Sequence, residues 1–533
     1  MKQKSRKTRP GNRPRSVGQL TVGRKWLFRL VALVVLPLLV LGGIELALRL
    51  AGFGYPTGIF KKSRIGDNTF LINNDDFSLR FFTPQTARFL GPLRMAVQKS
   101  AGTYRIFILG ESAAMGDPDP SYGASRYLEA LLEVRYPQAH FEIINLGITA
   151  INSNVILPIA RNCAANDGDL WIIYMGNNEM VGPFGAATVF GAKAPPVALI
   201  RFNLALQKTR LGQLLTALLR KLPAHGAKAS SWGGMEMFVG NQLAVDDPRK
   251  NTVYQNFSKN LDDVLKAGLG SGAKILLNTV AVNLRDCAPF ASLTDPNLPA
   301  AGRARFNQFF KAGVQAQSQK GFTEAISNFV QAAALDPNDA ELQFRWGKCL
   351  DASANYAEAK KHFQLACDDD ALPFRADSRI NGIIQGESKK FNNANLTLLD
   401  AAETLAADLP DKIPGQETFY EHVHFNFDGN YRLARAWAGQ IEGILPASVL
   451  QNAGTNAWAD QPACERRLGL SDWNRSLVME SVIQRLQKPP LSSQLGNGER
   501  AGALNRDISQ LIPRMNPTTA PEATRDFKNT LAE

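Results

Sequence analysis

Residues 104–117 read YRIFILGESAAMGD, an apolar run that ends at a glycine and passes into a stretch of small residues. The run is rich in isoleucine and aromatic side chains, which predicts a buried strand, and the small residues after it predict a helix. Ser112 therefore lies where a strand gives way to a helix. Two interpretations are open, because Ser112 is either a nucleophile or the cap of the following helix.

Four further segments have a similar apolar character. They are FEIIN (141–145), LWIIYM (170–175), ILLNTVAV (275–282) and the weaker LTLLDA (396–401). Amphipathic stretches such as 125–134 lie between them and predict helices. This alternation predicts βαβ units, and hence an α/β fold in which helices cover both faces of a parallel sheet.

The chain has 533 residues and a formal net charge of +12, but this charge is unevenly distributed. The first 30 residues hold ten lysines and arginines and no acid, which leaves only +2 for the rest of the chain. The basicity belongs to a terminal tail rather than to a groove. No nucleic-acid partner is therefore expected.

The basic tail runs into Trp26 and then into an apolar run over 30–50, interrupted only by Glu45 and Arg49. About 20 apolar residues are enough for a helix to cross a bilayer. The flanking positive charge predicts a cytoplasmic N-terminus and an extracytoplasmic, periplasmic remainder. A cleaved signal peptide is the alternative, but its apolar region is usually shorter, about 7–15 residues. We expect an uncleaved, single-pass anchor in the cell membrane.

A repeat of 34 residues lies in the second half of the chain. Glycine, alanine, phenylalanine and alanine recur in the same order, with Gly313, Ala325, Phe329 and Ala332 matched by Gly347, Ala359, Phe363 and Ala366. This period, with small residues where helices touch, is typical of tetratricopeptide helical hairpins. Two repeats are too few to bury a continuous core alone, so they are expected to pack on the α/β domain or on a protein partner.

Three other segments are less regular. Residues 51–103 are interpreted as a tether and an irregular docking segment, and 446–533 as a loosely ordered tail with one helix at 470–487. Residues 198–222 predict one basic amphipathic helix, either on a membrane surface or as a lid. The five cysteines lack metal-site spacing, so no metal is expected.

Polar residues and glycines follow the predicted strands. Ser112 follows the first strand, Asn145-Leu146-Gly147 ends the second, and Gly176-Asn177-Asn178-Glu179 ends the third. Far downstream lies Glu421-His422-Val423-His424, which holds two of the five histidines. In an open parallel sheet, ligands bind outside the carboxyl ends of the strands. A functional site is therefore expected at that edge.

The order of these blocks resembles the SGNH hydrolases, also called GDSL-like esterases and lipases. The family blocks Gly-Asp-Ser, Gly-x-Asn-Asp and Asp-x-x-His correspond here to Gly110-Glu111-Ser112, Gly176-Asn177-Asn178-Glu179 and Glu421-His422-Val423-His424. The resemblance covers about residues 104–440 and is greatest to the branch with inserted tetratricopeptide repeats. It implies a three-layer, flavodoxin-like parallel sheet with an inserted pair of helical hairpins.

The resemblance also implies a catalytic triad, with Ser112 as nucleophile, His424 as general base and Glu421 as the acid that orients the imidazole. The backbone N–H groups of Ser112 and Gly147 and the side-chain amide of Asn178 correspond to the oxyanion hole. No metal and no cofactor is implied.

The sequence departs from the family pattern at its acids, since Glu111, Glu179 and Glu421 all stand where aspartate is usual. The longer arm of Glu421 displaces the imidazole unless the backbone compensates. His422 is an alternative base, because an extended segment points residues two apart to the same side. The family spacing favours His424.

These features together predict a membrane-anchored serine ester hydrolase that acts through an acyl-enzyme. Its topology favours O-acyl groups on envelope glycans, or lipid-derived esters, as substrates. Two alternatives are an acyltransferase that uses the same triad and a non-catalytic scaffold whose repeats bind an envelope protein. The expected divisions are a basic tail (1–25), an anchor (26–50), a tether (51–103), a first hydrolase part (104–300), two repeats (301–380), a last hydrolase part (381–445) and a tail (446–533).

Overall fold

The structure is a computed structural model that describes residues 22–221, 231–454 and 457–515. The chain divides into two compact units. The first comprises 1–55 and 205–223, and the second comprises 56–204 and 224–533. The second unit contains both sheets of the described chain.

A five-stranded parallel sheet forms the centre of the second unit. In spatial order its strands are β5 (His140–Asn145), β4 (Thr103–Gly110), β6 (Leu170–Tyr174), β7 (Lys274–Asn278) and β8 (Leu396–Leu399). The predicted strands and their parallel pairing are therefore confirmed. The strand predicted over 275–282 ends earlier, at Asn278. Beyond it Thr279 donates its hydroxyl to Asp400 and Val280 its N–H to Asn381, so the chain leaves the ladder.

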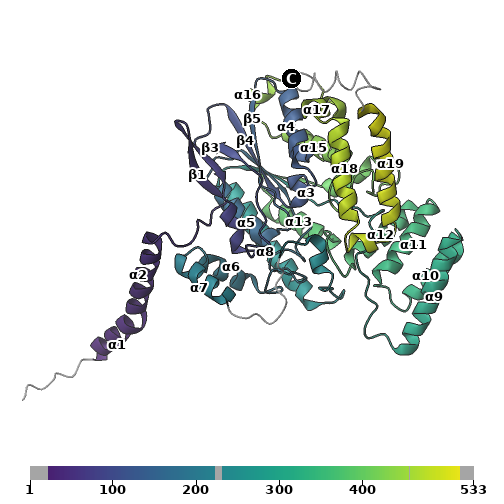
Figure 1. The fold of residues 1–533 in the computed structure, drawn as a ribbon, viewed down its shortest axis with the longest axis horizontal. Coiled ribbons are helices and arrows are strands. Elements are labelled where there is room, and N and C mark those ends of the chain that lie inside the picture. The colour runs from purple at the N-terminus through teal and green to yellow at the C-terminus, as the bar shows by residue number, and fades with distance from the viewer. Residues whose placement is uncertain (1–21, 222–230, 455–456, 516–533) are drawn as a thin grey trace, which may run out of the picture. The chain divides into compact units, whose positions relative to one another are not determined.

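The helices that connect the strands cover the sheet in two groups (Figure 1). Helix α4 packs against α15, whereas α5 packs against α8 and α8 against α13. Right-handed crossovers explain this grouping, because the chain steps from β4 to β5 in one direction and then returns past β4 to β6. The bounds are α4 (Ala124–Arg135), α5 (Ser153–Cys163), α8 (Pro248–Gly270), α13 (Ser378–Phe391) and α15 (Phe427–Glu442).

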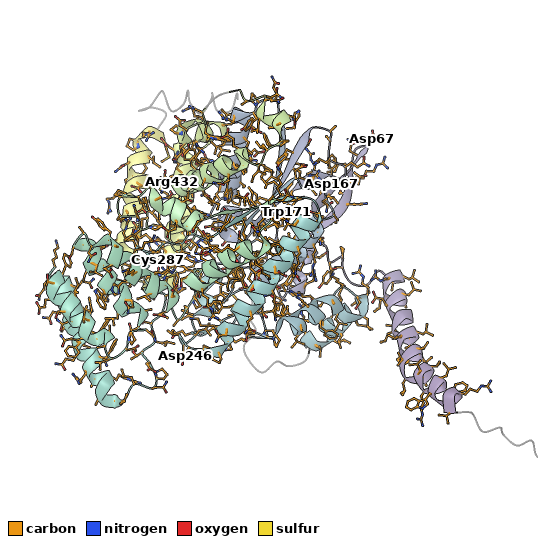
Figure 2. The ribbon with its side chains drawn as sticks, turned by 180° about the vertical axis from the view of Figure 1, so that it is seen from behind. Asp67, Asp167, Trp171, Asp246, Cys287 and Arg432 are labelled. Carbon is orange, nitrogen blue, oxygen red and sulfur yellow. The ribbon has the colours of Figure 1, made fainter. Side chains whose placement is uncertain are left out.

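Apolar side chains from both faces of the sheet are buried in one core. Ile106, Phe107, Ile172 and Trp171 are fully buried, and Trp171 lies within the sheet in Figure 2. Consecutive buried residues along each strand explain why these strands read as continuous apolar runs rather than alternating ones. All five cysteines lie among the described residues, buried and without a disulfide.

The segment 51–103 is more regular than expected. It contains an antiparallel sheet of three strands, β1 (Phe60–Ile65), β2 (Asn68–Asn73) and β3 (Arg94–Ala96). The turn between β1 and β2 is tight, with Gly66 at a φ of 60°. Phe77 and Phe82 from the following residues join the main core. The sequence did not show this because the strands carry mostly charged and polar side chains.

The N-terminal helix runs from Val22 to Leu50 and consists of α1 (Val22–Leu30), a π-helical turn (Val31–Val35) and α2 (Leu36–Leu50). Its apolar side chains are exposed. It is long and apolar enough to span a membrane, and a signal sequence passes the same test. Residues 1–21 of the predicted basic tail lie outside the described residues.

The predicted helix over 198–222 is two helices, α6 (Val197–Leu206) and α7 (Arg210–Lys221). Thr209 makes the break, because its hydroxyl accepts the Gly212 N–H at 3.0 Å. In the first unit, α7 begins against α2, where Glu45 accepts the backbone N–H groups of Arg210 and Leu211. Negative charge at a helix N-terminus stabilises it. Residue 222 lies outside the described residues.

The repeat region forms four helices, α9 (Ala300–Ser318), α10 (Phe322–Ala333), α11 (Ala340–Ala352) and α12 (Tyr356–Asp368). Within each pair the repeated glycine faces the repeated phenylalanine. A Cβ atom on Gly313 would lie 2.5 Å from the Phe329 ring, and one on Gly347 would lie 2.8 Å from the Phe363 ring. The two hairpins therefore pack in the same way, with the glycine of the first helix against the phenylalanine ring of the second.

The C-terminal tail is better ordered than expected as far as Met515. Helices α18 (Asp472–Leu486) and α19 (Asn497–Met515) lie side by side (Figure 1) and bury their own apolar cluster around Val482 and Leu486. The helix predicted over 470–487 is confirmed as α18. The remaining short helices are α14 (Ala401–Ala407), α16 (Ala447–Leu450) and α17 (Gln461–Arg467).

The contact between glycine and phenylalanine in the repeat hairpins, α9–α10 and α11–α12, generates a stability prediction. Gly313→Ala forces a methyl group into the Phe329 ring and is expected to lower the free energy of unfolding by about 1–3 kcal/mol. Gly386→Ala, in α13, is the matched control, because a Cβ there meets nothing within 4 Å. It is expected to be neutral or to stabilise by up to about 1 kcal/mol. Urea denaturation of both variants checks this, and equal effects would contradict it.

Candidate functional site

The site lies where the strand order reverses, at the carboxyl ends of β4 and β6. Crevices form at such switch points in parallel sheets, because the connections leave in opposite directions. Ser112 is the first residue of the short helix α3 (Ser112–Met115), and Glu111 holds the cap position. Ser112 is thus not the helix cap. Its hydroxyl is free to face the crevice.

A chain of hydrogen bonds joins Ser112 to His424 and Glu421. Ser112 Oγ lies 2.8 Å from His424 Nε2, and His424 Nδ1 bonds Glu421 Oε1. A carboxylate at Nδ1 selects the tautomer that donates from Nδ1, so Nε2 accepts the Ser112 hydroxyl proton. All three side chains are buried. The structure therefore brings together the serine, histidine and glutamate that the sequence singled out.

The backbone accommodates the longer arm of Glu421. Its side chain folds back on its own chain, where Oε2 accepts the N–H groups of His422 at 2.7 Å, Val423 at 3.3 Å and His424 at 3.4 Å. Burial raises the pKa of Glu421, but the two neighbouring histidines and the hydrogen bonds outweigh it and hold this pKa well below its usual range. Glu421 is consequently ionised beside the imidazole.

His422 lies next to this chain but does not reach Ser112 by a hydrogen bond. Its Nδ1 is 2.8 Å from Glu421 Oε2 without hydrogen-bond geometry, and its ring packs edge-on against Phe290 and Phe374. Burial in this apolar surround lowers the pKa of His422, which keeps it neutral. Of the two histidines, His424 is the one placed to accept a proton from Ser112.

An arginine from the C-terminal hairpin, which α18 and α19 form, completes the cluster. Arg485 of α18 donates to Glu421 Oε1 at 3.0 Å and to Asp117 Oδ1 at 2.5 Å, and it lies 3.1 Å from His424 Nδ1. Burial lowers the pKa of His424, yet the charges of Glu421 and Asp117 raise it above its ordinary value. The neutral, proton-accepting form of His424 therefore predominates only above that raised pKa.

The same cluster contains donor atoms that are close enough to hold a metal. Glu421, His422 and His424 each offer one ligand atom, all within 4.8 Å of one another. However, the Arg485 cation already lies against two of these three residues, at 3.0 Å from Glu421 Oε1 and 3.1 Å from His424 Nδ1. A metal there requires displacement of Arg485 and loss of the Glu421–His424 hydrogen bond. The donor set fits a positioned imidazole better than a metal.

Glu111 joins the ends of the two strands that flank the site. Its buried carboxylate accepts the backbone N–H groups of Gly176 at 3.2 Å, Asn177 at 2.9 Å and Asn178 at 3.2 Å. Glu179 is buried next to it and bonds the N–H and hydroxyl of Ser153. These bonds fix the loop after β6. The side-chain amide of Asn178 is thereby held at the crevice and bonds no other described residue.

The structure does not bring Gly147 to the site as expected. Its N–H donates to Asn145 Oδ1 at 2.9 Å, and a Cβ on it would lie 2.6 Å from Met115 N. Glycine is needed here for close packing behind α3, not for donation into the crevice. Ala150, at a φ of 58°, lines the crevice instead. A positive φ in an alanine is strained, and such strain is concentrated at functional sites.

The crevice is a cavity of about 440 Å³ in the second unit, with Ser112, Asn178 and His424 in its wall. Val181, Phe238, Phe374 and Leu491 supply apolar surface. Arg88, Arg485 and Lys488 supply positive charge, and Asp117 supplies one carboxylate. This size is within the range of small-molecule sites.

Several residues of the site were not singled out from the sequence. Nothing in their sequence context distinguished Asp117, Ala150 or Arg485. Arg485 lies in a predicted helix, but the helix pattern does not show which partner its face meets. Neither a scan against protein-family models nor a search of curated proteins found a match for this chain.

The charges around His424 generate a prediction. Asp117→Asn removes a charge that raises the pKa of His424, so this pKa is expected to fall. NMR titration of protein labelled with ¹³C at histidine Cε1 measures it directly. Asp67→Asn, in the exposed turn before β2 (Figure 2), is the control and is expected to leave it unchanged. An unshifted His424 in Asp117→Asn would contradict the electrostatic account.

Proposed function

We propose that this protein is a serine ester hydrolase of the SGNH type, with Ser112 as nucleophile, His424 as general base and Glu421 as the orienting acid. The continuous hydrogen-bond chain from Ser112 through His424 to Glu421 carries the proposal. Ser112 and His424 are 312 residues apart in the sequence, yet they share a buried site with Glu421 at the switch point of the sheet. The order and spacing of the sequence blocks support the same assignment.

In the proposed reaction, Ser112 Oγ attacks the carbonyl carbon of an ester while His424 Nε2 takes the hydroxyl proton. A tetrahedral intermediate forms and collapses, the C–O bond to the alcohol breaks, and His424 returns the proton to the departing alcohol. Water then attacks the acyl-serine, again giving its proton to His424. The bond between the acyl carbon and Ser112 Oγ breaks, His424 returns the proton to Ser112 Oγ, and the carboxylic acid leaves. Glu421 stays ionised throughout and stabilises the imidazolium.

The developing oxyanion needs donors that point into the crevice. We assign the side-chain amide of Asn178 and the backbone N–H of Ser112 to this role. Because Gly147 N–H is engaged by Asn145, we assign the third donor to the backbone N–H of Ala150. Glu111 is a positioning residue, since it holds the loop that presents Asn178.

We further propose that Val22–Leu50 anchors the chain in the membrane with the N-terminus in the cytoplasm, as the basic tail indicates. The two hairpins α9–α10 and α11–α12 are proposed as tetratricopeptide repeats, because the glycine–phenylalanine contact recurs in both. The site then acts on esters at the outer side of the membrane. A retired, scaffold-only enzyme is not favoured, since such a chain has no reason to keep the buried Ser112–His424–Glu421 geometry.

The proposal is tested first by covalent labelling of the detergent-solubilised full-length protein. A fluorophosphonate probe is expected to label the parent and Ser271→Ala, a control serine after α8, but not Ser112→Ala. Release of p-nitrophenol from acetate and butyrate esters is expected to follow the same pattern. An unlabelled but well-folded parent, shown folded by circular dichroism and thermal unfolding, would overturn the hydrolase proposal.

The oxyanion assignment is tested with Asn178→Ala. Loss of one such donor is expected to lower kcat by about 10²–10³-fold with little change in KM, because the bond strengthens only in the transition state. Asn452→Ala, in the exposed segment after α16, is the control and is expected to retain parental kcat. A loss confined to KM would show that Asn178 binds the ground state instead.

A further inference from the structure

The wall of the cavity contains a cation, Arg88, that neighbouring side chains hold in place. Arg88 donates Nε–H to Thr149 Oγ1 at 2.8 Å, and its guanidinium carbon lies 4.5 Å from the centroid of the Trp232 ring. Trp232 in turn stacks on Phe190, with 6.1 Å between ring centroids and 13° between planes. Arg88 is thus fixed by one hydrogen bond and by a stack of rings.

This fixed cation forms no ion pair with a described carboxylate, although the charge of Asp117 acts on it at longer range. Arg88 is half-buried, and burial lowers its pKa, yet it forms no ion pair with any residue that the structure describes. The carboxylate of the cavity wall, Asp117, is taken by Arg485. Partly buried charges are usually paired, because an uncompensated charge loses hydration without a partner. A guanidinium that is held still and unpaired is complementary to an anionic ligand.

A second cation without an ion pair lines the same cavity. Lys488 follows α18 at the rim and makes no ion pair within the described chain. The described residues that line the cavity carry three cations, Arg88, Arg485 and Lys488, against the single carboxylate of Asp117. The ionised Glu421 behind the wall also offsets Arg485, but with both histidines neutral the three cations still exceed the two carboxylates. The second unit as a whole, by contrast, is nearly balanced in sequence charge. The positive charge is therefore local to the site.

We propose that the cavity binds an ester that carries an oxyanionic group, a carboxylate or a phosphate, and that Arg88 is the specificity-determining residue that holds this group, with Lys488 at the rim. This inference rests on the proposed hydrolase function for its reaction, but the anion site stands on its own geometry. A guanidinium offers two parallel N–H donors that match both kinds of oxyanion, so each is tested separately.

The first arm of the test measures how fast the full-length protein hydrolyses two esters that differ only in charge. The acetate of 5-hydroxy-2-nitrobenzoate carries a carboxylate, and the acetate of 5-hydroxy-2-nitrobenzamide has the same shape without charge. The parent is expected to prefer the anionic ester by about tenfold or more in kcat/KM. The preference is expected to collapse in Arg88→Gln, to weaken in Lys488→Gln and to shrink as salt is added.

The matched control is Arg94→Gln. Arg94 also lies over an aromatic ring, Phe70, at 5.2 Å, but it is exposed on β3 and lies outside the cavity wall. Arg94→Gln is expected to keep the parental preference. The inference is overturned if the parent shows no preference for the anionic ester, or if Arg88→Gln and Arg94→Gln keep the same preference.

The second arm measures binding without turnover. Calorimetry with Ser112→Ala follows the binding of 5-hydroxy-2-nitrobenzoate and of 4-nitrophenyl phosphate, and separates carboxylate from phosphate as the better ligand. The affinity for one of these two anions is expected to be about tenfold or more lower in the double variant Ser112→Ala, Arg88→Gln than in Ser112→Ala. That result supports the anion site even if the parent hydrolyses no ester. In that case the hydrolase proposal fails alone. If neither anion binds, or if Arg88→Gln has no effect, the anion site fails.

Discussion

The arrangement of the second unit depends on how one buried charge is compensated. The Glu421 carboxylate is fully buried, and an unpaired carboxylate in that position costs several kcal/mol. Three backbone N–H groups, the imidazole of His424 and the guanidinium of Arg485 meet its two oxygens. Each partner comes from a segment that is thereby fixed. The loop before α15 and the C-terminal hairpin are joined through this carboxylate, and His424 extends the connection to Ser112 at the start of α3.

The sheet could be predicted from the sequence because its signal is local. A strand buried on both faces must be apolar at every position, and Ile106, Phe107 and Ile172 show this directly. The strands β1 and β2 escaped prediction because only Leu71 among their side chains is buried and because they carry lysine, arginine and asparagine. Helix α18 was predicted, but its pairing with α19 was not. The apolar cluster of this pair is small and separate from the main core, and it includes Tyr122 and Tyr420 from distant segments.

At the site, the residues of the Ser112–His424–Glu421 chain could be predicted, but the other charged residues around them could not. The spacing of Glu421 and His424 within one short segment made their pairing readable, and the structure shows them bonded. Gly147 illustrates a related ambiguity. In sequence, a glycine needed for close packing against Met115 cannot be distinguished from a glycine whose backbone N–H donates into the crevice. Arg485 and Arg88 approach the site from opposite ends of the chain. Such contacts have no period or spacing that a sequence could display.

The sequence separations within the site set the order in which it is assembled. Ser112 and His424 are 312 residues apart, and Asp117 and Arg485 are 368 residues apart. During synthesis β4 and Ser112 emerge long before His424, and Arg485 emerges last. Until residue 424 has emerged, Ser112 has no imidazole partner, and a nascent or truncated chain that stops before residue 485 lacks the cation that pairs with Glu421 and Asp117. The buried cluster is therefore completed only when nearly all of the described chain has been made.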